Sequence, residues 1–311
     1  MARIFFQRAP SGFRTVQGEL IKKLQQVLIA GGFLQDKDDG IFGGNTERAV
    51  QSFQEQNQLS ATGKVDDQTW QKLMSSPAPD LKQRCLQLTA DFEGTGFTKA
   101  VGNFDGAGIT WGIIGFTLSN GELGAVLDEI RSSHPAVFSA AFGDLEPKIV
   151  AVLGSSHGDQ IRFADSISLG SSKIRILDVW ANAFEKLGND PAVQEIQLQR
   201  TQNFFDIADR DVQRFNVQNE LGLALCFDIA VQNGGIDGTE GTRIKNKINQ
   251  NHPATQQDLR IIIANVVAEN SRPQFVEDVR RRKLTMATAE GTVHGSRFAV
   301  KTWGLDDISA N

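Results

Sequence analysis

An apolar helix that ends in an acidic residue is the feature that most constrains how this chain folds. Apolar residues recur on one face of a 3.6-residue period at Leu81, Cys85, Leu88 and Phe92. Pro79-Asp80 precedes the run, where a helix cap belongs, and Gly94 follows it as a stop. The pattern predicts a buried helix over residues 81–93. Glu93 then lies at its C-terminal end, where apolar surroundings and the helix dipole favour a protonated carboxyl, as a general acid requires.

A second acid follows in a glycine-rich turn. Asp105 opens the phrase Asp-Gly-Ala-Gly-Ile-Thr, which ends at Thr110, and glycines that admit water leave this carboxyl free to stay ionised. Two carboxyls in unlike environments are the working parts of a glycosidase. Each piece alone has a plainer interpretation, because a Glu at a helix end is usually solvated and Asp-Gly-x-Gly is usually a turn. Their order, directly after an apolar helix, favours a catalytic pair.

The pair resembles the active site of the chitosanases of glycoside hydrolase family 46, which belong to the lysozyme superfamily. The resemblance rests on the acid that ends a helix and on the hairpin phrase Asp-Gly-x-Gly-Ile-Thr-x-Gly; residues 225–234 and Arg280-Arg281-Arg282 also match. It implies that Glu93 is the general acid, that Asp105 is the base and that Thr110 helps to hold the attacking water. The two acids are closer in sequence than in the family, which leaves the substrate more open than the reaction type.

Other residues of these stretches are expected to bind substrate: Trp111, Asp228, Gln232, Asn233 and His294. Asp228 falls in a nearly all-apolar helix expected over residues 220–232, where a buried carboxylate needs partners. One arginine of the run 280–282 could supply a partner and so orient the site from behind; the alternative is a solvated arginine. His294, near a glycine turn, could line the cleft, although a structural histidine is the commoner case.

The first part of the chain has the pattern of a small three-helix unit. Residues 17–30 form one predicted helix, Asn45 or Thr46 caps a second, and Trp70 lies in a third. The unit resembles the peptidoglycan-binding module of cell-wall hydrolases. The matching residues are Leu24-Gln25, Gly32-Phe33, Asp39-Gly40-Ile41-Phe42-Gly43, Thr46, Ala49-Val50, Phe53-Gln54, Gly63, Val65-Asp66 and Thr69-Trp70. The turn from Asp39 to Thr46 is the expected ligand contact; a bare docking or spacer domain is the alternative.

A Ser- and Pro-containing stretch, Ser75-Ser76-Pro77-Ala78-Pro79, is the expected domain boundary. The sequence therefore predicts a peptidoglycan-binding domain over residues 1–76, a linker over 77–80 and a lysozyme-like catalytic domain over 81–311. The expected fold class is mainly α (α+β), with a small β-hairpin at the active site. Further helices are predicted over residues 123–130, 135–153, 173–187, 190–215, 220–232 and 255–269.

Composition excludes several function classes. The 311-residue chain has a net charge of −5, so no global basic field attracts nucleic acid. The four histidines lack metal-ligand spacing, so neither a metal nor another cofactor is expected. The N-terminus lacks the apolar segment of a signal peptide, and no stretch is apolar enough to span a membrane. Cys85 and Cys226, within apolar helical patterns, are expected to be buried free thiols; a disulfide that joins two core helices is the alternative.

Three functions remain open. The leading hypothesis is an inverting, muramidase-like hydrolase of peptidoglycan, made in the cytoplasm and acting on the cell wall after phage lysis, as an endolysin, or after export by a secretion machine, as an antibacterial effector. Chitosan hydrolysis is the second, although no acid-rich stretch suited to a polycation is evident. A lytic transglycosylase would need only Glu93, so Asp105 and Thr110 argue against it. The non-enzymatic alternative is a cell-wall binding protein.

Overall fold

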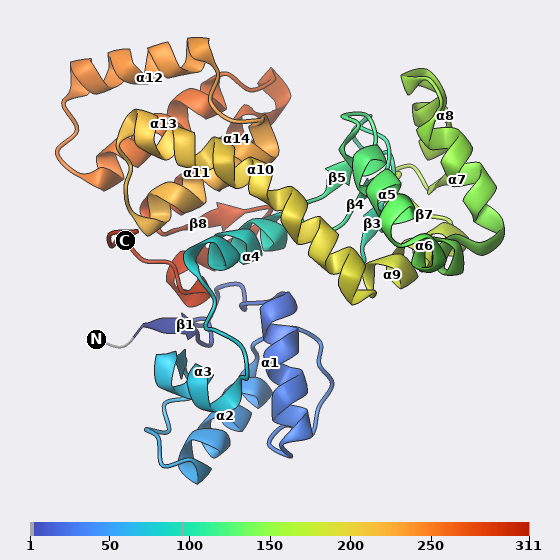
Figure 1. Cartoon of the computed structure of the whole chain (residues 1–311). Helices are drawn as coiled ribbons and strands as arrows, with labels where there is room; N and C mark the ends of the chain where they lie inside the picture. Colours follow the sequence, from blue (N-terminus) through green and yellow to red (C-terminus); the bar gives the residue numbers. More distant parts are fainter. Residues whose placement is uncertain (1–2, 95, 311) are drawn as a thin grey trace. The chain divides into compact units, whose positions relative to one another are not determined.

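The chain divides into two compact units. In the computed structural model, which describes residues 3–94 and 96–310, the first unit comprises Met1–Phe92 and Phe204–Asn311, and the second comprises Glu93–Asn203. Helices dominate both units, and the strands form small sheets of two or three strands (Figure 1). The predicted mainly helical fold class is therefore confirmed. The predicted boundary at residues 77–80 does not coincide with this division and stays a prediction.

The N-terminal module of the first unit contains three helices and a short sheet. The elements are β1 (Ile4–Phe6), α1 (Glu19–Ala30), α2 (Gly44–Gln56), β2 (Val65–Asp66), antiparallel to β1, and α3 (Asp67–Leu73). Two buried glutamines hold its glycine turns. Gln25 accepts a hydrogen bond from the Gly40 backbone N–H at 2.7 Å, and Gln54 accepts one from the Gly63 N–H at 2.9 Å. Both glycines have positive φ, so each turn needs the residue that adopts it without strain.

The rest of the first unit is built around one buried helix. Its elements are α4 (Leu81–Glu93, continuing to the edge of the unit), the C-terminal part of α10 (Pro191–Phe215), α11 (Glu220–Asn233), α12 (Gly238–Asn251), α13 (Gln256–Glu269), η2 (Pro273–Phe275), α14 (Val276–Thr288), the hairpin β8 (Glu290–Val293) and β9 (Ser296–Ala299), and η3 (Val300–Trp303). Every residue of α11 from Glu220 to Ala230 is buried, which confirms the predicted central helix. Cys85 and Cys226 are buried free thiols, as expected.

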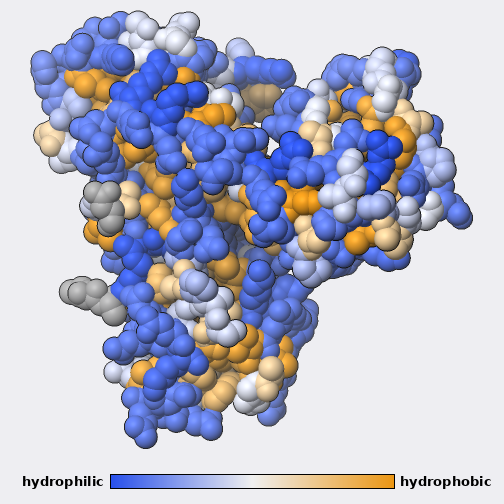
Figure 2. Space-filling view, viewed as in Figure 1, coloured by the Kyte–Doolittle hydropathy of each residue, from blue (hydrophilic) through white to orange (hydrophobic). Residues whose placement is uncertain are grey.

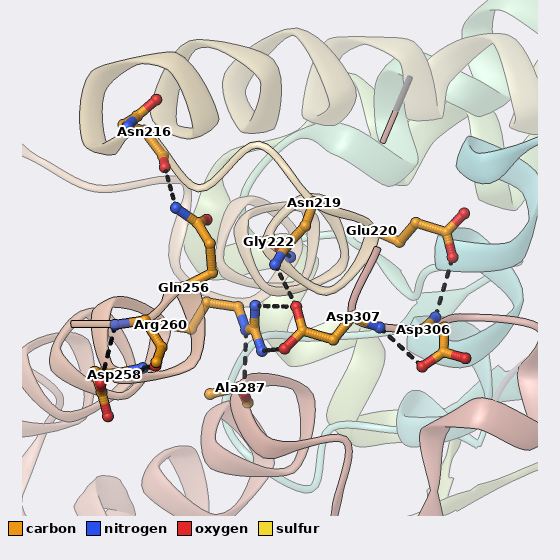
Figure 3. A network of polar contacts seen from close by, with 11 residues as sticks. Asn216, Asn219, Glu220, Gly222, Gln256, Asp258, Arg260, Ala287, Asp306 and Asp307 are labelled. Atoms are coloured by element: carbon orange, nitrogen blue, oxygen red, sulfur yellow. Dashed lines mark hydrogen bonds and ion pairs between the residues drawn. The ribbon is translucent and has the colours of Figure 1, made fainter. Parts of the chain in front are cut away.

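Polar contacts fasten the C-terminal tail to this helical core (Figure 3). The buried guanidinium of Arg260, on α13, donates to both carboxylate oxygens of Asp307 at 2.9 and 3.0 Å and to the Ala287 carbonyl at 3.0 Å. Asn219, the N-cap of α11, also donates to Asp307. The Asp306 backbone N–H donates to Glu220 at 3.0 Å. The tail thereby satisfies buried charges of the core, as such groups require.

The second unit consists of a three-stranded sheet and short helices. Its elements are β3 (Ala100–Val101), β4 (Thr110–Trp111), β5 (Phe116–Thr117), α5 (Glu122–Ser133), α6 (Pro135–Phe142), η1 (Gly143–Leu145), α7 (Glu146–Leu153), α8 (His157–Ile167), the pair β6 (Ser168–Leu169) and β7 (Arg175–Ile176), α9 (Asp178–Gly188) and the first part of α10. Aromatic rings pack its core; Phe142, for example, lies edge-on to Phe184 at 5.5 Å between centroids.

Two predicted helices of the second unit are wrong in extent. The helix predicted over 135–153 is broken after Phe142, because Gly143 has a positive φ of 48° and Pro147 cannot donate a helical hydrogen bond. The helix predicted over 173–187 begins only at Asp178. Lys173 has a φ of 51°, outside the helical region, and the following residues form β7 instead.

Candidate functional site

Helix α4 delivers Glu93 as its last residue. Asp80 begins the helix with a reciprocal cap: its carboxylate accepts from the Gln83 N–H at 2.8 Å, and the Gln83 side chain accepts from the Asp80 N–H at 3.0 Å. All residues from Arg84 to Phe92 are buried, whereas Glu93 is half-buried. The acid therefore lies where a buried helix ends and a loop begins.

A buried charge cluster supports one side of α4. Asp228, fully buried on α11, accepts hydrogen bonds from Arg282 at 2.7–3.0 Å and from Lys283 at 2.5 Å. Thr89 donates to the same carboxylate at 3.3 Å. Thr89 precedes Glu93 by four residues, so the two lie on the same face of α4. The cluster therefore holds the face of the helix that carries the acid.

The charges of this cluster set the protonation of Asp228. Burial alone would raise the pKa of Asp228, but the positive charges and hydrogen bonds of Arg282 and Lys283 outweigh it and lower the pKa from 3.8 to about 2. The predicted Arg–Asp link is thus present through Arg282, with Lys283 as a partner that the sequence did not indicate. Asp228 supports α4 through its hydrogen bond with Thr89. Its full burial disfavours the predicted direct contact with substrate.

Asp105 lies on the loop that joins β3 to β4. Its side chain is exposed, and its Oδ1 accepts from the Ala107 backbone N–H at 2.9 Å, as an Asx turn does. Gly106 and Gly108 have φ values of 88° and 82°, which other L-residues rarely adopt. The loop therefore presents a solvated carboxylate, the environment predicted for the second acid.

Asn103 braces this loop, and sequence analysis did not single it out. The Asn103 Oδ1 accepts from the Gly108 N–H at 2.8 Å, across the segment that carries Asp105, and its Nδ2 donates to Asp165 at 2.8 Å. The Asn103 backbone N–H donates to the Ser168 hydroxyl at 2.9 Å. The sequence shows only an Asn two residues before the loop acid, and the burial of its side chain becomes evident in the structure.

Thr110 and Trp111 form β4 but have different surroundings. Thr110 is half-buried and pairs with Val101 on β3 and Thr117 on β5. Trp111 is fully buried, with its ring 5.5 Å from that of Phe184. Trp111 is thus a core residue, and its predicted contact with substrate is disfavoured by this burial.

Gln197 of α10 joins the β4–β5 turn to the segment that precedes β3. It is fully buried, accepts from the Ile113 N–H at 2.9 Å and donates to the Phe97 carbonyl at 3.0 Å. A Cβ on Gly112 would lie 2.6 Å from the Gln197 Oε1, so the close approach requires glycine there.

The remaining predicted residues of the C-terminal region lie in the first unit. Gln232 is half-buried near the end of α11, and its Oε1 is buried without a hydrogen-bond partner in the described part of the chain. Asn233, the last residue of α11, is exposed. His294, in the β8–β9 turn, is exposed, and its Nε2 lies 3.4 Å from the Asp278 Oδ1. Their substrate contacts stay predictions.

In the N-terminal module the predicted turn is held from inside. Thr46 is buried and accepts from Gln25 at 3.1 Å, and Asp39 accepts from the same Gln25 at 3.0 Å. A hollow of about 500 Å³ lies nearby, and neither residue lines it. Its lining residues are Phe33, Leu34, Gln35, Asp36, Asn45, Arg48, Ala49 and Ser52. The ligand contacts predicted for Asp39 and Thr46 stay predictions, and burial disfavours that of Thr46.

Several large apolar side chains of the second unit are exposed: Phe104, Ile174, Leu177 and Val179. On the face drawn in Figure 2, apolar side chains interrupt the hydrophilic surface of the unit that carries α5 to α9. Phe104, 55% exposed, immediately precedes Asp105. An exposed ring beside a carboxylate offers an apolar face to a sugar ring and a polar group to its hydroxyls.

Within residues 3–94 and 96–310, no group of three or more His, Cys, Asp or Glu side chains is placed to hold a metal ion. No helix in the same described residues has the length and apolarity needed to cross a membrane.

The comparisons with known proteins agree with this architecture. Residues 17–73 match the family described as "Putative peptidoglycan binding domain". The chain is similar in structure to a family 46 chitosanase of Gynuella sunshinyii solved with chitotetraose, at 17% identity and a TM-score of 0.50, over 69% of this chain and 88% of that one. It is also similar to a chitosanase mutant of Bacillus subtilis solved with six GlcN units, at 16% identity and a TM-score of 0.50, over 72% and 100% of the two chains. The suspected combination of a peptidoglycan-binding module with a chitosanase-like fold is confirmed.

Proposed function

We propose that this protein hydrolyses the β-1,4-linked glycan strands of bacterial peptidoglycan, with Glu93 as general acid and Asp105 as general base. The observation that carries the proposal is the pair of acids in unlike settings: Glu93, half-buried, ends a buried helix, and Asp105, exposed, lies on a glycine-rich loop. A fold similar to that of chitosanases and a match to a peptidoglycan-binding family support it.

The proposed reaction consumes one water for each bond cleaved. Glu93 donates its proton to the glycosidic oxygen while the bond from that oxygen to C1 breaks. Asp105 takes a proton from a water that Thr110 helps to hold, and the water oxygen bonds to C1 from the opposite face. Exchange with solvent then reprotonates Glu93 and deprotonates Asp105. Attack from the opposite face inverts the configuration at C1.

The binding module favours peptidoglycan over chitosan as substrate. A module that binds the cell wall concentrates the enzyme on that polymer, and this targeting gives no advantage on a soluble polycation. The proposed place of action is therefore the cell wall, reached through phage lysis or a secretion machine. The chitosanase alternative rests on the structural relatives and predicts release of glucosamine oligomers from chitosan.

Exchange of the acid tests the proposal. Glu93→Gln keeps the shape of the side chain but cannot donate the proton, so fragment release from purified peptidoglycan, followed by mass spectrometry, should fall by about 10²- to 10⁴-fold. Glu195→Gln, an exposed residue of α10, is the matched control and should keep full activity. Near-full activity of Glu93→Gln would overturn the proposal. Wild-type protein that sediments with sacculi but releases no fragment would support a binding protein instead.

Stereochemistry tests the role of the second acid. If Asp105 activates water, the first product from a β-linked strand is the α-anomer, which proton NMR detects before mutarotation. Asp105→Asn should slow hydrolysis more than Thr110→Val, because the first removes the base and the second removes only one contact to the water. A β-anomer appearing first would assign a retaining mechanism and remove the proposed role of Thr110.

A further inference from the structure

The segment before α1 grips the helix that carries Glu93. Asp91 lies on α4, two residues before the acid, and its side chain is 1% exposed. Arg14 donates to its carboxylate through Nε at 3.0 Å and through Nη2 at 2.7 Å, and Gln17 donates through Nε2 at 2.5 Å. This cluster, the Arg14–Gln17–Asp91 clasp, joins the N-terminal module to α4 within the first unit.

The clasp satisfies a carboxylate that would otherwise be costly to bury. Burial raises the pKa of Asp91 above its usual value, and the hydrogen bonds and charge of Arg14, with the hydrogen bond of Gln17, offset part of that rise. The Arg14 guanidinium also lies 5.7 Å from the ring centre of Phe298, and Phe298 packs edge-on against Phe92 at 4.8 Å. The last turn of α4 is thus joined to Arg14 directly through Asp91, and indirectly through Phe298 of β9, which contacts both Arg14 and Phe92.

A second connection lies at the start of α4. Glu220, buried on α11 and part of the network in Figure 3, accepts from Arg84 of α4 at 3.1 Å and also pairs with Arg3, next to β1. The expected linker is also fastened, because the Trp70 Nε1 donates to the carbonyls of Ser76 and Pro77 at 3.0 Å. These bonds are those of a docked domain, not of a freely tethered anchor.

Helical geometry explains what the clasp fixes. Asp91 and Glu93 are about 200° apart around the helix axis, so the module holds the face opposite the acid. Thr89, on the face of the acid, is held by the Asp228 cluster. Support from both faces limits rotation of the last turn about its axis, and such rotation would swing the Glu93 carboxyl away from a bound glycosidic oxygen. A misplacement of about 1 Å costs up to about a hundredfold in rate.

We infer that Arg14 and Gln17 of the peptidoglycan-binding module are positioning residues for Glu93 and act through Asp91. The inference rests on the proposed role of Glu93 as the acid. The module then has a second task besides wall binding: it completes the support of the catalytic helix. Removal of the module would therefore impair turnover even on substrates that it does not bind.

Steady-state kinetics of full-length variants on soluble, peptide-free glycan strands test this inference. Arg14→Gln should lower kcat by about ten- to a hundredfold and leave KM within about twofold, because the acid is displaced while substrate contacts remain. Arg14→Lys, which keeps the charge but loses the planar fork, should recover part of the loss. Arg8→Gln is the matched control, since it removes an exposed ion pair with Glu47 inside the module and should leave kcat unchanged.

Two further measurements keep the result unambiguous. Hydrogen exchange of the peptide spanning residues 84–93 should accelerate in Arg14→Gln and not in Arg8→Gln, which separates a loosened α4 from global unfolding. Asp91→Asn should reproduce the loss, and the double variant should be no worse than either single variant. Full kcat in Arg14→Gln, together with an inactive Glu93→Gln, would overturn the inference alone. An active Glu93→Gln would overturn the proposed function and the inference with it.

Discussion

The two acids of the candidate site are held by opposite physical means. Glu93 ends a helix supported by the buried Asp228 cluster on one side and by the Arg14–Gln17–Asp91 clasp on the other. Asp105 lies on an exposed glycine-rich loop braced by the side chain of Asn103. A proton donor benefits from a fixed, partly dry setting, whereas a base that activates water needs solvent within reach.

The way in which each acid is held predicts how strongly a mutation near it lowers the free energy of unfolding. Removal of one partner from a buried ion cluster leaves an uncompensated charge, which costs far more than the net value of the interaction. Loss of a hydrogen bond in the loop leaves one neutral polar group without a partner, which costs less free energy. We therefore expect changes behind Glu93 to lower the free energy of unfolding more than changes behind Asp105.

The largest expected effect comes from Asp228→Asn. The amide removes the buried carboxylate charge that Arg282 and Lys283 contact, so the free energy of unfolding should fall by about 3–5 kcal/mol, measured by urea denaturation. Glu277→Gln is the control, because the exposed Glu277 pairs with Arg280 and Arg281 on the same helix, and the loss of these pairs should cost less than about 1 kcal/mol. Equal losses in the two variants would break the comparison.

Acid should weaken the Asp228 cluster in a defined pH window. The folded-state pKa of Asp228, about 2, lies below its unfolded value of about 3.8, so the ionised carboxylate stabilises the fold. This stabilisation is fully present above about pH 4 and is lost as the pH falls toward about 2. The stability difference between wild type and Asp228→Asn should shrink by roughly 2 kcal/mol across that window. A difference that stays constant down to pH 2 would contradict this assignment.

The local sequence pattern was sufficient to predict helix α4, which carries Glu93. The apolar period and the Asp80 cap gave the observed bounds of α4, Leu81–Glu93, and the all-apolar run gave α11. Helix α12 was not predicted because its sequence, Gly-Thr-Glu-Gly-Thr-Arg-Ile-Lys-Asn-Lys-Ile-Asn-Gln-Asn, has few apolar residues; a capping box at Asp237 begins it. Caps and tertiary packing, not periodicity, determine such a helix.

Long-range pairing could be predicted only where few partners were available. A carboxylate in an apolar helix demands a cation, and the run 280–282 offered three; the phase of α14 selects Arg282 and adds Lys283. The clasp joins Arg14 and Asp91, which are 77 residues apart, and no local periodicity connects them. The predicted substrate role of Trp111 shows the same limit, because burial depends on the packing of the whole unit.

The smallest expected effect on stability comes from the brace of the Asp105 loop. Asn103→Ala removes the acceptor of the buried Gly108 N–H and the donor to Asp165, so the free energy of unfolding should fall by about 1–2 kcal/mol. Asn120→Ala, an exposed residue of the same unit, is the matched control and should cost less than about 0.5 kcal/mol. Because the loop carries the proposed base, Asn103→Ala should also slow glycan hydrolysis in a steady-state assay, although the residue lies outside the reacting pair. If Asn103→Ala loses as much stability as Asp228→Asn, the two acids are supported alike. If Asn103→Ala loses stability but keeps full kcat, the position of Asp105 does not depend on the brace.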